Sequence, residues 1–289
     1  MFKQNGKFAS ISKLVVVMLI AIVTFTACKE KEPEPEQVPL FRILDEALAS
    51  EQYGVGFRKD DIALGLEVQK AFDQMIADGT AAKISIDRFR KDYLLKNQPF
   101  LKENTAPAGD LSFEKVKEKG ELIVGGDIST RPMFYLTTGE YRGFDVELAL
   151  EVGKRLDIPV TFKGIEWENK EKELNEGNID CIWSGLSITD TRLKAMFFGK
   201  AYMANRSVIM VKGDSPVKKI SDLAGKVVGA QLGSSHLEAL EKNPVYPKIT
   251  RVITPPNTFS LFYELKSGAI DAIVIDEISW EAIIAYFLE

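Results

Sequence analysis

The stretch ELNEGNIDCIWSG at residues 173–185 returns near the other end of the chain as ELKSGAIDAIVID at residues 264–276. The two share the frame E-L-x-x-G-x-I-D-x-I, which reads as a helix end, a glycine turn and a buried strand that runs into polar residues. One short match can arise by chance between two ordinary helix–strand turns. Each copy, however, stands within its own series of strands and helices, so we expect two related α/β lobes.

From residue 121 onward, apolar runs alternate with helical patterns. GFDVELALEVGKRLD at 143–157 places apolar residues at helical spacing, and it is followed by the alternating run PVTFKGI at 159–165. Strands that alternate with helices favour βα units on largely parallel, buried sheets. AYMANRSVIMVK at 201–212 is a long run typical of a strand without a helix. We expect it to cross from one lobe to the other.

The first residues predict a secretory leader. LVVVMLIAIVTFTA at 14–27 is too short for a comfortable membrane span and follows a basic start. Its end, FTAC, resembles a bacterial lipobox, so we predict a signal peptide at 1–27 and lipidation of Cys28. The charged, proline-rich segment that follows reads as a tether, giving 28–39 to the lipidated cysteine and tether. An ordinary signal peptide cut elsewhere is the alternative.

Composition and charge exclude some function classes. The chain has 289 residues, 45% hydrophobic and 27% charged, as in soluble globular proteins with one large or two modest domains. Without the three leader lysines, 34 basic and 42 acidic residues give a net charge of −8. This balance argues against nucleic acid as a partner. The one other cysteine, Cys181, lies in an apolar run, so we expect it buried and no disulfide framework.

Polar residues follow several of the expected strands. Asp127 comes after ELIVGG, the polar residues 184–187 after CIW, and Asp276 after AIVI. The turn GSSH at 233–236 leads into a helix that Ser234 and Ser235 can cap. Because ligands of open α/β sheets bind beyond the carboxyl ends of the strands, we expect these groups to meet at one site.

Two charged residues suggest the ligand's chemistry. Arg192 falls in the first turn of a helix predicted to be capped by Thr189, where the helix dipole disfavours a cation. It fits better there if it shares a carboxylate with the free N–H groups, although a surface pair with Asp190 is the alternative. Asp276 follows four apolar residues, so its carboxylate needs a cation. A ligand that supplies both a carboxylate and an ammonium is an α-amino acid.

Catalytic patterns are weak in this sequence. The single histidine, His236, has no partner that would complete a metal set or a Cys–His pair. GDISTRPMF and VGGD are not phosphate-cradling loops. We therefore predict a protein that is not an enzyme and uses no cofactor or metal.

The run from about 121 to 289 resembles the extracytoplasmic solute-binding proteins, family 3, that serve polar amino-acid ABC transporters. The resemblance rests on GFDVELALEVGKRL, the run from Trp167 to Gly185, LSITDTR, DLAGKVVGAQLGSS and IDAIVIDE. It implies an α/β, two-lobe periplasmic-binding-protein-like fold (type II), with two crossing hinge strands that close on the ligand.

The same resemblance assigns roles to individual residues. It implies that Arg192 takes the ligand carboxylate and Asp276 the ammonium, and that Trp167 covers one face. Thr130 stands where the family commonly has an aromatic residue, so the side-chain pocket is expected to be more open or more polar. The full set of ligand-binding predictions is Arg192, Asp276, Asp127, Ser184, Gly185, Ser187, Trp167, Ser234, Ser235, Thr130 and His236, with Asp127 and His236 toward the ligand's side chain.

EQYGVGFRKDD at 51–61 belongs, in that family, near the carboxyl end of the chain. Here it comes first, which predicts a circular permutation with its break between Glu289 and the strand near Phe41. A dimer that swaps this block and the remnant of a tandem array are the alternatives. The expected segments are a closing strand of lobe 2 at 40–50, a closing part of lobe 1 at 51–95, a linker at 96–112, lobe 1 at 113–203 and lobe 2 at 204–289.

The resulting functional hypothesis is a lipid-anchored, extracytoplasmic receptor. It binds a polar amino acid between its lobes and delivers it to an ABC transporter permease. The alternative is a cyclohexadienyl (arogenate or prephenate) dehydratase-like enzyme on the same fold, with Asp127, Glu168 or His236 as its candidate acids. A sensory module is a third interpretation, disfavoured because no transmembrane or signalling segment follows Glu289.

Overall fold

The computed structural model describes residues 39–102, 104–280 and 282. The predicted signal peptide, Cys28 and nearly all of the tether lie outside the described residues. One compact unit begins at Val38 and holds every described residue. Among these residues no helix is both long and apolar enough to cross a membrane.

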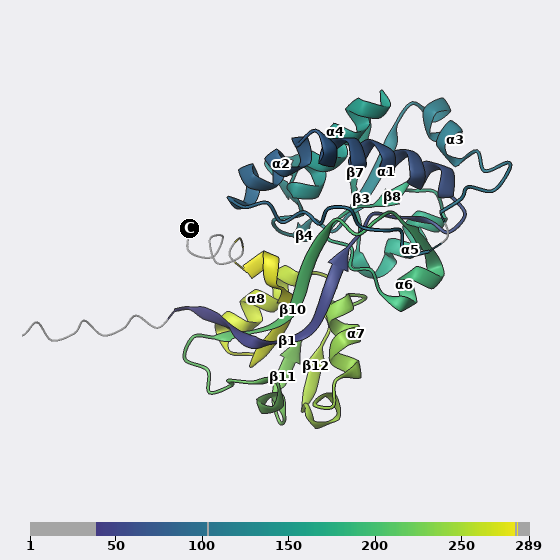
Figure 1. Ribbon diagram of the computed structural model, residues 1–289. Helices are drawn as coiled ribbons and strands as arrows, with labels where there is room; N and C mark the ends of the chain where they lie inside the picture. Colours follow the sequence, from purple (N-terminus) through teal and green to yellow (C-terminus); the bar gives the residue numbers. More distant parts are fainter. Residues whose placement is uncertain (1–38, 103, 281, 283–289) are drawn as a thin grey trace, which may run out of the picture. The chain divides into compact units, whose positions relative to one another are not determined.

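The helices and strands alternate along most of the chain (Figure 1). The strands are β1 (Phe41–Tyr53), β2 (Gly56–Arg58), β3 (Leu122–Gly126), β4 (Ser129–Thr130), β5 (Phe134–Thr137), β6 (Glu140–Arg142), β7 (Val160–Gly164), β8 (Cys181–Ile182), β9 (Met196–Phe198), β10 (Met203–Lys212), β11 (Val227–Gly229), β12 (Arg251–Ile253) and β13 (Ala272–Asp276). The α-helices are α1 (Ile62–Ala77), α2 (Thr80–Phe89), α3 (Ser112–Lys119), α4 (Phe144–Leu156), α5 (Lys170–Asn175), α6 (Asp190–Ala195), α7 (Ser235–Lys242) and α8 (Thr258–Ser267).

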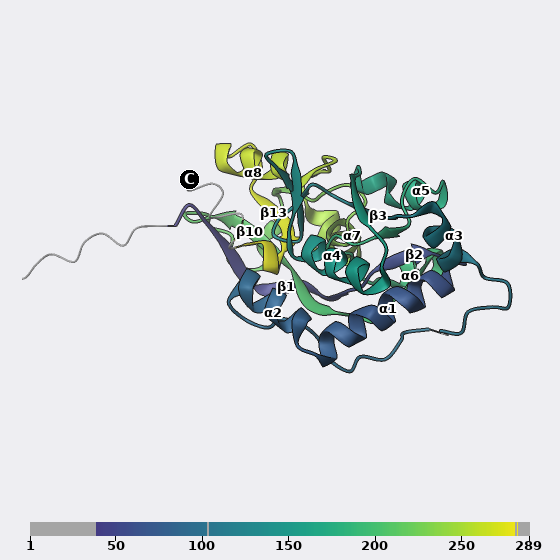
Figure 2. The ribbon, with the colours of Figure 1, turned by 90° about the horizontal axis from the view of Figure 1, so that it is seen from above.

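One five-stranded sheet, with the order β7-β3-β8-β2-β9, forms the core of lobe 1. β3 pairs in parallel with β7 and β8, whereas β2 is antiparallel to both β8 and β9. The early helix α1 packs against α2, α3 and α4 on this lobe (Figure 2). Its apolar face is buried as the helical spacing predicts, through Leu64, Val68, Phe72 and Met75.

The second five-stranded sheet, with the order β1-β10-β13-β11-β12, forms lobe 2. β11 is parallel to β12 and β13, and β10 is antiparallel to β1 and β13. Apolar clusters cover both faces, one around Ile209 and Val211 and the other around Val208 and Met210. Successive β10 residues therefore point to opposite faces, so the strand is apolar on both sides as buried strands are.

β1 and β10 run side by side in lobe 2 and lead into lobe 1 (Figure 1). β10 confirms the long strand predicted in 201–212. Within this chain, β1 of the early block pairs with β10, and β2 fits between β8 and β9. The permuted order of the segments stays a proposal.

The apolar run Tyr53–Phe57, within the stretch EQYGVGFRKDD, is divided between two strands of different sheets. Tyr53 ends β1, and β2 begins at Gly56 in the other sheet, so β1 also continues past the predicted boundary at residue 50. Gly54 lies between the two strands, and a Cβ there would meet the Ile188 side chain at 2.8 Å. A strand that serves both lobes cannot be separated into two by its apolar pattern alone.

A three-stranded sheet of β4, β5 and β6 was not predicted. Its strands have two to four residues, too short for a pattern of alternation to stand out. Cys181 is buried as expected. The helix starts were predicted correctly at two places, since Thr189 caps α6 and Ser234 caps α7 through their side chains.

Candidate functional site

A small cavity lies where the two lobes meet, and we call it the cleft cavity. Its volume is about 20 Å³, the room for about one water molecule. Lobe 1 and lobe 2 both line it. The lining residues are Thr130, Trp167, Ser184, Gly185, Ser187, Arg192, Gln231, Ser234, Ser235, His236 and Asp276.

Hydrogen bonds join the lobes around this cavity. Four of them link the two lobes directly. The Gly233 carbonyl accepts from Lys170 Nζ at 2.9 Å and from Arg192 Nη2 at 3.2 Å. Ser235 Oγ donates to Ser187 Oγ at 2.9 Å, and Gln231 Nε2 donates to Asp127 Oδ2 at 2.5 Å. The structure is therefore a closed form of the two lobes.

Arg192 forms part of the lobe 1 side of the cavity. Its guanidinium is buried, and it donates to the Ser187 carbonyl at 2.8 Å as well as to Gly233. Burial lowers its pKa below the ordinary value, against the attraction of the surrounding carboxylates. Its Cζ lies 5.8 Å from the centre of the Trp167 ring, within cation–π range. The alternative of a surface pair with Asp190 is excluded for a buried side chain whose partners are carbonyl oxygens.

Lys170 is a second buried cation on the same side, and it was not among the predicted site residues. Its Nζ donates to the Trp167 carbonyl at 3.2 Å and lies 5.2 Å from that ring's centre. Burial and the charge of Arg192 lower the pKa of Lys170 to about 8. Two cations therefore meet at one neutral oxygen, the carbonyl of Gly233. In the sequence, Lys170 stands in a polar helical stretch that looks like a solvated surface.

Asp276 ends β13 on the lobe 2 side. One carboxylate oxygen accepts hydrogen bonds from the Tyr53 hydroxyl and from Asn205 Nδ2, the latter at 2.7 Å. The other lies 3.1 Å from His236 Nε2. Burial raises the Asp276 pKa, but the charge of His236 and these hydrogen bonds lower it overall. The carboxylate is thus ionised and fully paired within the protein.

Glu51, from β1, adds a second carboxylate that was not among the predicted site residues. Its side chain is only 6% exposed. It accepts hydrogen bonds from Ser207 at 2.9 Å, from Asn205 at 3.1 Å and from Ser187 at 3.2 Å. Asn205 therefore bridges the two carboxylates, since it also donates to Asp276. Glu51 sits on a strand whose sequence, ALASEQY, shows nothing unusual at that position.

Asp127 does not line the cleft cavity, although it lies beside it. Its Oδ1 accepts from the Ser129 amide at 2.8 Å and hydroxyl at 2.7 Å, and its Oδ2 from Gln231. Ser184 accepts from the Asp127 amide at 3.1 Å. In this closed form Asp127 holds the lobes together through Gln231 rather than facing the cavity. Gln231 lines the cavity and was not among the predicted site residues.

Behind the lining loop, the buried Asp145 fixes the turn that carries Ser184 and Gly185. It accepts from the Gly185 amide at 2.6 Å and from the Tyr202 hydroxyl at 2.8 Å. Burial raises the pKa of Asp145 to about 7. Gly185 has a φ of 58°, a conformation that other residues adopt with strain.

Glu51, His236 and Asp276 each offer one atom of the kind that binds metals, all within 4.8 Å of one another. Protons and hydrogen bonds already hold these atoms to each other and to their neighbours in the described part of the chain. We therefore assign them no role as metal ligands.

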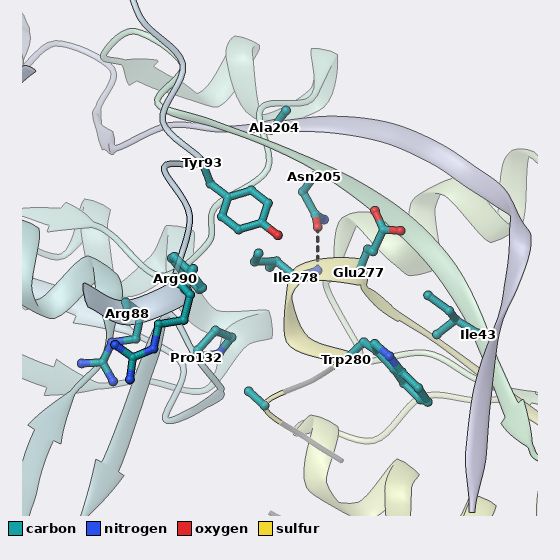
Figure 3. Close-up of a pocket in the computed structure, with 12 residues that line it drawn as sticks. Ile43, Arg88, Arg90, Tyr93, Pro132, Ala204, Asn205, Glu277, Ile278 and Trp280 are labelled. Atoms are coloured by element: carbon teal, nitrogen blue, oxygen red, sulfur yellow. Dashed lines mark hydrogen bonds between the residues drawn. The ribbon is translucent and has the colours of Figure 1, made fainter. Parts of the chain in front are cut away.

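A second cavity, of about 490 Å³ and so far larger than the cleft cavity, lies elsewhere (Figure 3). Arg88, Tyr93 and Trp280 line it, and Asn205 reaches it with Oδ1, which accepts from the Ile278 amide at 3.3 Å. Its rim includes Ala282, next to residues that the structure does not describe. We therefore assign it no function. Neither Arg192 nor Asp276, the oppositely charged groups that line the cleft cavity, lines this second cavity.

Ten of the eleven residues predicted to bind the ligand line the cleft cavity, Asp127 being the exception. Their role in binding stays a prediction. His236 lies against Asp276 rather than toward a separate side-chain pocket. The meeting of Arg192 and Asp276 was predictable because both follow strands of sheets whose carboxyl ends face one crevice.

Comparison with known proteins gives a consistent result. Residues 122–251 match the model of the bacterial extracellular solute-binding proteins, family 3. The chain is 30% identical over 181 residues to a glutamine-binding protein of Geobacillus stearothermophilus, covering 61% of this chain and 68% of that protein. It is 30% identical over 168 residues to an L-cystine-binding protein of Escherichia coli, covering 57% of this chain and 62% of that protein.

Solved structures agree. A substrate-binding protein of an ABC uptake transporter from Streptococcus pneumoniae, with bound histidine, matches with a TM-score of 0.58 and 32% identity, over 62% of this chain and 75% of that chain. These matches confirm the two-lobe α/β fold of the type II periplasmic-binding proteins. The chain spans about three fifths of the length of the first curated relatives that it matches.

Proposed function

The chain belongs to the bacterial extracellular solute-binding proteins of family 3, and on that basis we propose that it binds a polar α-amino acid between its lobes and delivers it to an ABC transporter permease. One observation carries the proposal. Arg192 of lobe 1 and Asp276 of lobe 2 line the same cavity. A carboxylate on Arg192 and an ammonium on Asp276 would be the two charged groups of one amino acid.

Binding requires the lobes to open, because the cleft cavity of about 20 Å³ is smaller than any amino acid. β1 and β10 are the strands that connect the lobes, so they are the hinge of our proposal. On closure, the ligand carboxylate would replace the carbonyl oxygens that Arg192 now contacts. The closed, ligand-bound form would be the one that the permease recognises.

The expected affinity follows from the charged contacts. A hydrogen bond to a charged group contributes about 1.5–3 kcal/mol. Two or three of them, with burial of the ligand's apolar part against Trp167, would give about −8 kcal/mol, a micromolar Kd. Ser184, Gly185, Ser187 and Ser235 would supply the remaining polar contacts. Thr130, Ser234, His236 and, after opening, Asp127 complete the proposed set.

Relatives named for amino acids support this reading. The Geobacillus protein is named for glutamine, the Escherichia protein for L-cystine, and the Streptococcus structure holds histidine. The proposal includes the location: outside the cytoplasm, with Cys28 as a lipid anchor to the membrane. A lipid on Cys28 would keep the receptor near its permease.

The test is isothermal titration of the unit Val38–Glu289 against a panel of twenty amino acids. We expect one-to-one binding of one class, lost in Arg192→Ala and in Asp276→Ala. Arg206→Ala is the matched control, since Arg206 is a half-exposed arginine paired with Glu277. No heat from any amino acid, with a folded protein, would contradict the proposal.

The dehydratase alternative stays a prediction, and no feature of the cavity favours it. Asp127 is paired with Gln231 and Ser129, and His236 with Asp276. Incubation with prephenate or arogenate, followed by detection of the aromatic product, separates a dehydratase from a receptor.

A further inference from the structure

The only histidine of the chain lies where the proposed function needs a ligand's ammonium. His236 Nε2 is 3.1 Å from Asp276 Oδ2, on the carboxylate that would hold that ammonium. The side chain is buried, at 7% exposure, and lines the cleft cavity. It stands in the second position of α7, whose start is fixed by the Ser234 cap.

The hydrogen bonds show which form of the imidazole is present. Ser207 Oγ donates its one hydrogen to Glu51 at 2.9 Å, so it can only accept from His236 Nδ1, 2.6 Å away. Asp276 is an ionised carboxylate and accepts only, so Nε2 also carries a hydrogen. Both ring nitrogens are donors, and His236 is therefore an imidazolium cation.

Charged groups face His236 from several elements. Asp276 of β13 and Glu51 of β1 attract its charge, with Glu51 Oε1 3.9 Å from Nδ1, and Arg192 of α6 repels it. Burial lowers the pKa of His236, but the two carboxylates raise it overall to about 9. The hydrogen bonds and the surrounding charges thus agree on a protonated ring at neutral pH.

We propose that His236 is a built-in competitor for the ammonium subsite, which the incoming amino acid displaces from Asp276 with release of the imidazolium proton. This inference rests on the proposed function of amino-acid binding. An ammonium placed beside Asp276 while His236 is still protonated adds a further cation next to Arg192, and like charges in a closed cavity repel strongly, so loss of the imidazolium proton is favoured. The proton leaves His236 for solvent, and the ligand's ammonium takes its place on the carboxylate.

The competition sets how strongly binding depends on pH. His236 has a pKa of about 9 in the ligand-free closed form. To displace it at pH 7, the ligand must drive deprotonation of the imidazolium two pH units below this pKa. The cost of this deprotonation weakens binding by as much as about 100-fold. Affinity should rise about tenfold per pH unit between pH 6 and 8, one proton being released per ligand. Ligands without an ammonium would leave His236 in place and release no proton.

The first experiment needs no ligand. Because the chain has one histidine, the nitrogen-15 chemical shifts of a histidine-labelled Val38–Glu289 unit report on His236 alone. We expect two protonated ring nitrogens at pH 7 and a titration well above pH 7.5. A neutral ring at pH 7 would overturn the proposal.

The second experiment is titration calorimetry with the tightest amino acid of the panel, in buffers of different ionisation enthalpy. We expect nearly one proton released at pH 7 in the wild type. His236→Gln, which keeps a neutral donor, should release none and bind up to about 100-fold more tightly. His236→Lys, a cation that does not titrate near neutral pH, should bind weakly with little change from pH 6 to 8.

The outcomes separate the two proposals. Binding without proton release, or equal affinities for the wild type and His236→Gln at pH 6, overturns the competitor and leaves the amino-acid receptor intact. If no amino acid binds either protein while both are folded, the receptor fails and the competitor role fails with it. Circular dichroism of each variant establishes that it is folded.

Discussion

The two sides of the cleft cavity carry opposite charges and satisfy them differently. On lobe 1, Arg192 and Lys170 form a cationic wall whose hydrogen bonds go to neutral main-chain carbonyls. On lobe 2 and its hinge strand, Asp276 and Glu51 form an anionic wall, and Asp276 already holds a cation, His236. A ligand carboxylate would compete with neutral oxygens, whereas a ligand ammonium would compete with a full charge.

This difference teaches which half of an amino acid should dominate recognition. A charge-assisted bond is worth roughly twice a neutral one. Exchanging a carbonyl for a carboxylate on Arg192 therefore gains free energy, while exchanging an imidazolium for an ammonium on Asp276 gains little at neutral pH. We expect the cationic wall to supply most of the affinity and the anionic wall to make it depend on pH.

Arg192→Ala should have the largest effect. Loss of two charge-assisted bonds, about 3–6 kcal/mol, weakens amino-acid binding at least about 100-fold. Titration calorimetry measures this loss of affinity, and Arg192→Lys is the comparison variant. Lysine keeps the charge without the planar fork, so it should restore part of the affinity. Affinity in Arg192→Ala within tenfold of the wild type would contradict the dominance of the cationic wall.

The anionic wall should govern how stability changes with pH. The His236 pKa is raised from its ordinary 6.5 to about 9. The protonated imidazolium therefore contributes its full stabilisation of the folded state below pH 6.5, and this contribution is lost as the pH rises through 9. The free energy of unfolding should fall by about 3 kcal/mol over this range. Urea unfolding at several pH values measures it. His236→Gln should lack this pH-dependent contribution to the free energy of unfolding. Identical pH profiles of stability for the wild type and His236→Gln would refute the contribution of His236.

Much of this site followed from the sequence, and the rest depended on closure. Strand ends and helix caps are local features, so Arg192, Asp276 and the Thr189 and Ser234 caps were predictable. Lys170 and Gln231 act across the cleft, and no local pattern shows which residues a closed form will bring together. The same holds for the extended segment that passes from β1 in the lobe 2 sheet to β2 in the lobe 1 sheet.

Lys170 allows a smaller test of the cationic wall. Its pKa is lowered to about 8, below that of an unfolded lysine, so the unfolded chain binds more protons between pH 8 and 10.5. Stability should therefore rise with pH in that window, and this rise should be absent in Lys170→Met. At pH 7 the variant should bind the amino acid about three- to tenfold more weakly.

Lys163→Met is the control for Lys170, since Lys163 is a half-exposed lysine of the same lobe paired with Glu173. It should leave both the affinity and the pH profile unchanged. If Lys170→Met binds as the wild type does, then Lys170 is a structural residue and not part of the wall.

The smallest expected effect concerns chain order. Glu51 of the anionic wall comes from the early block, which we propose to be circularly permuted. A chain that starts at residue 110, runs to 289 and continues through a flexible linker into 40–95 should bind with an affinity within about twofold of the original. Sedimentation should show a monomer. A relinked chain that folds only as a dimer would favour the swapped alternative.

The most direct measurement compares the tightest amino acid of the panel with its two truncated analogues, the amine that lacks the carboxylate and the acid that lacks the ammonium. We predict that at pH 7 the amine loses at least about 100-fold in affinity, because it leaves Arg192 without an anion. The acid should lose clearly less, because His236 stays on Asp276. An amine that binds as well as the amino acid would contradict recognition by the two walls.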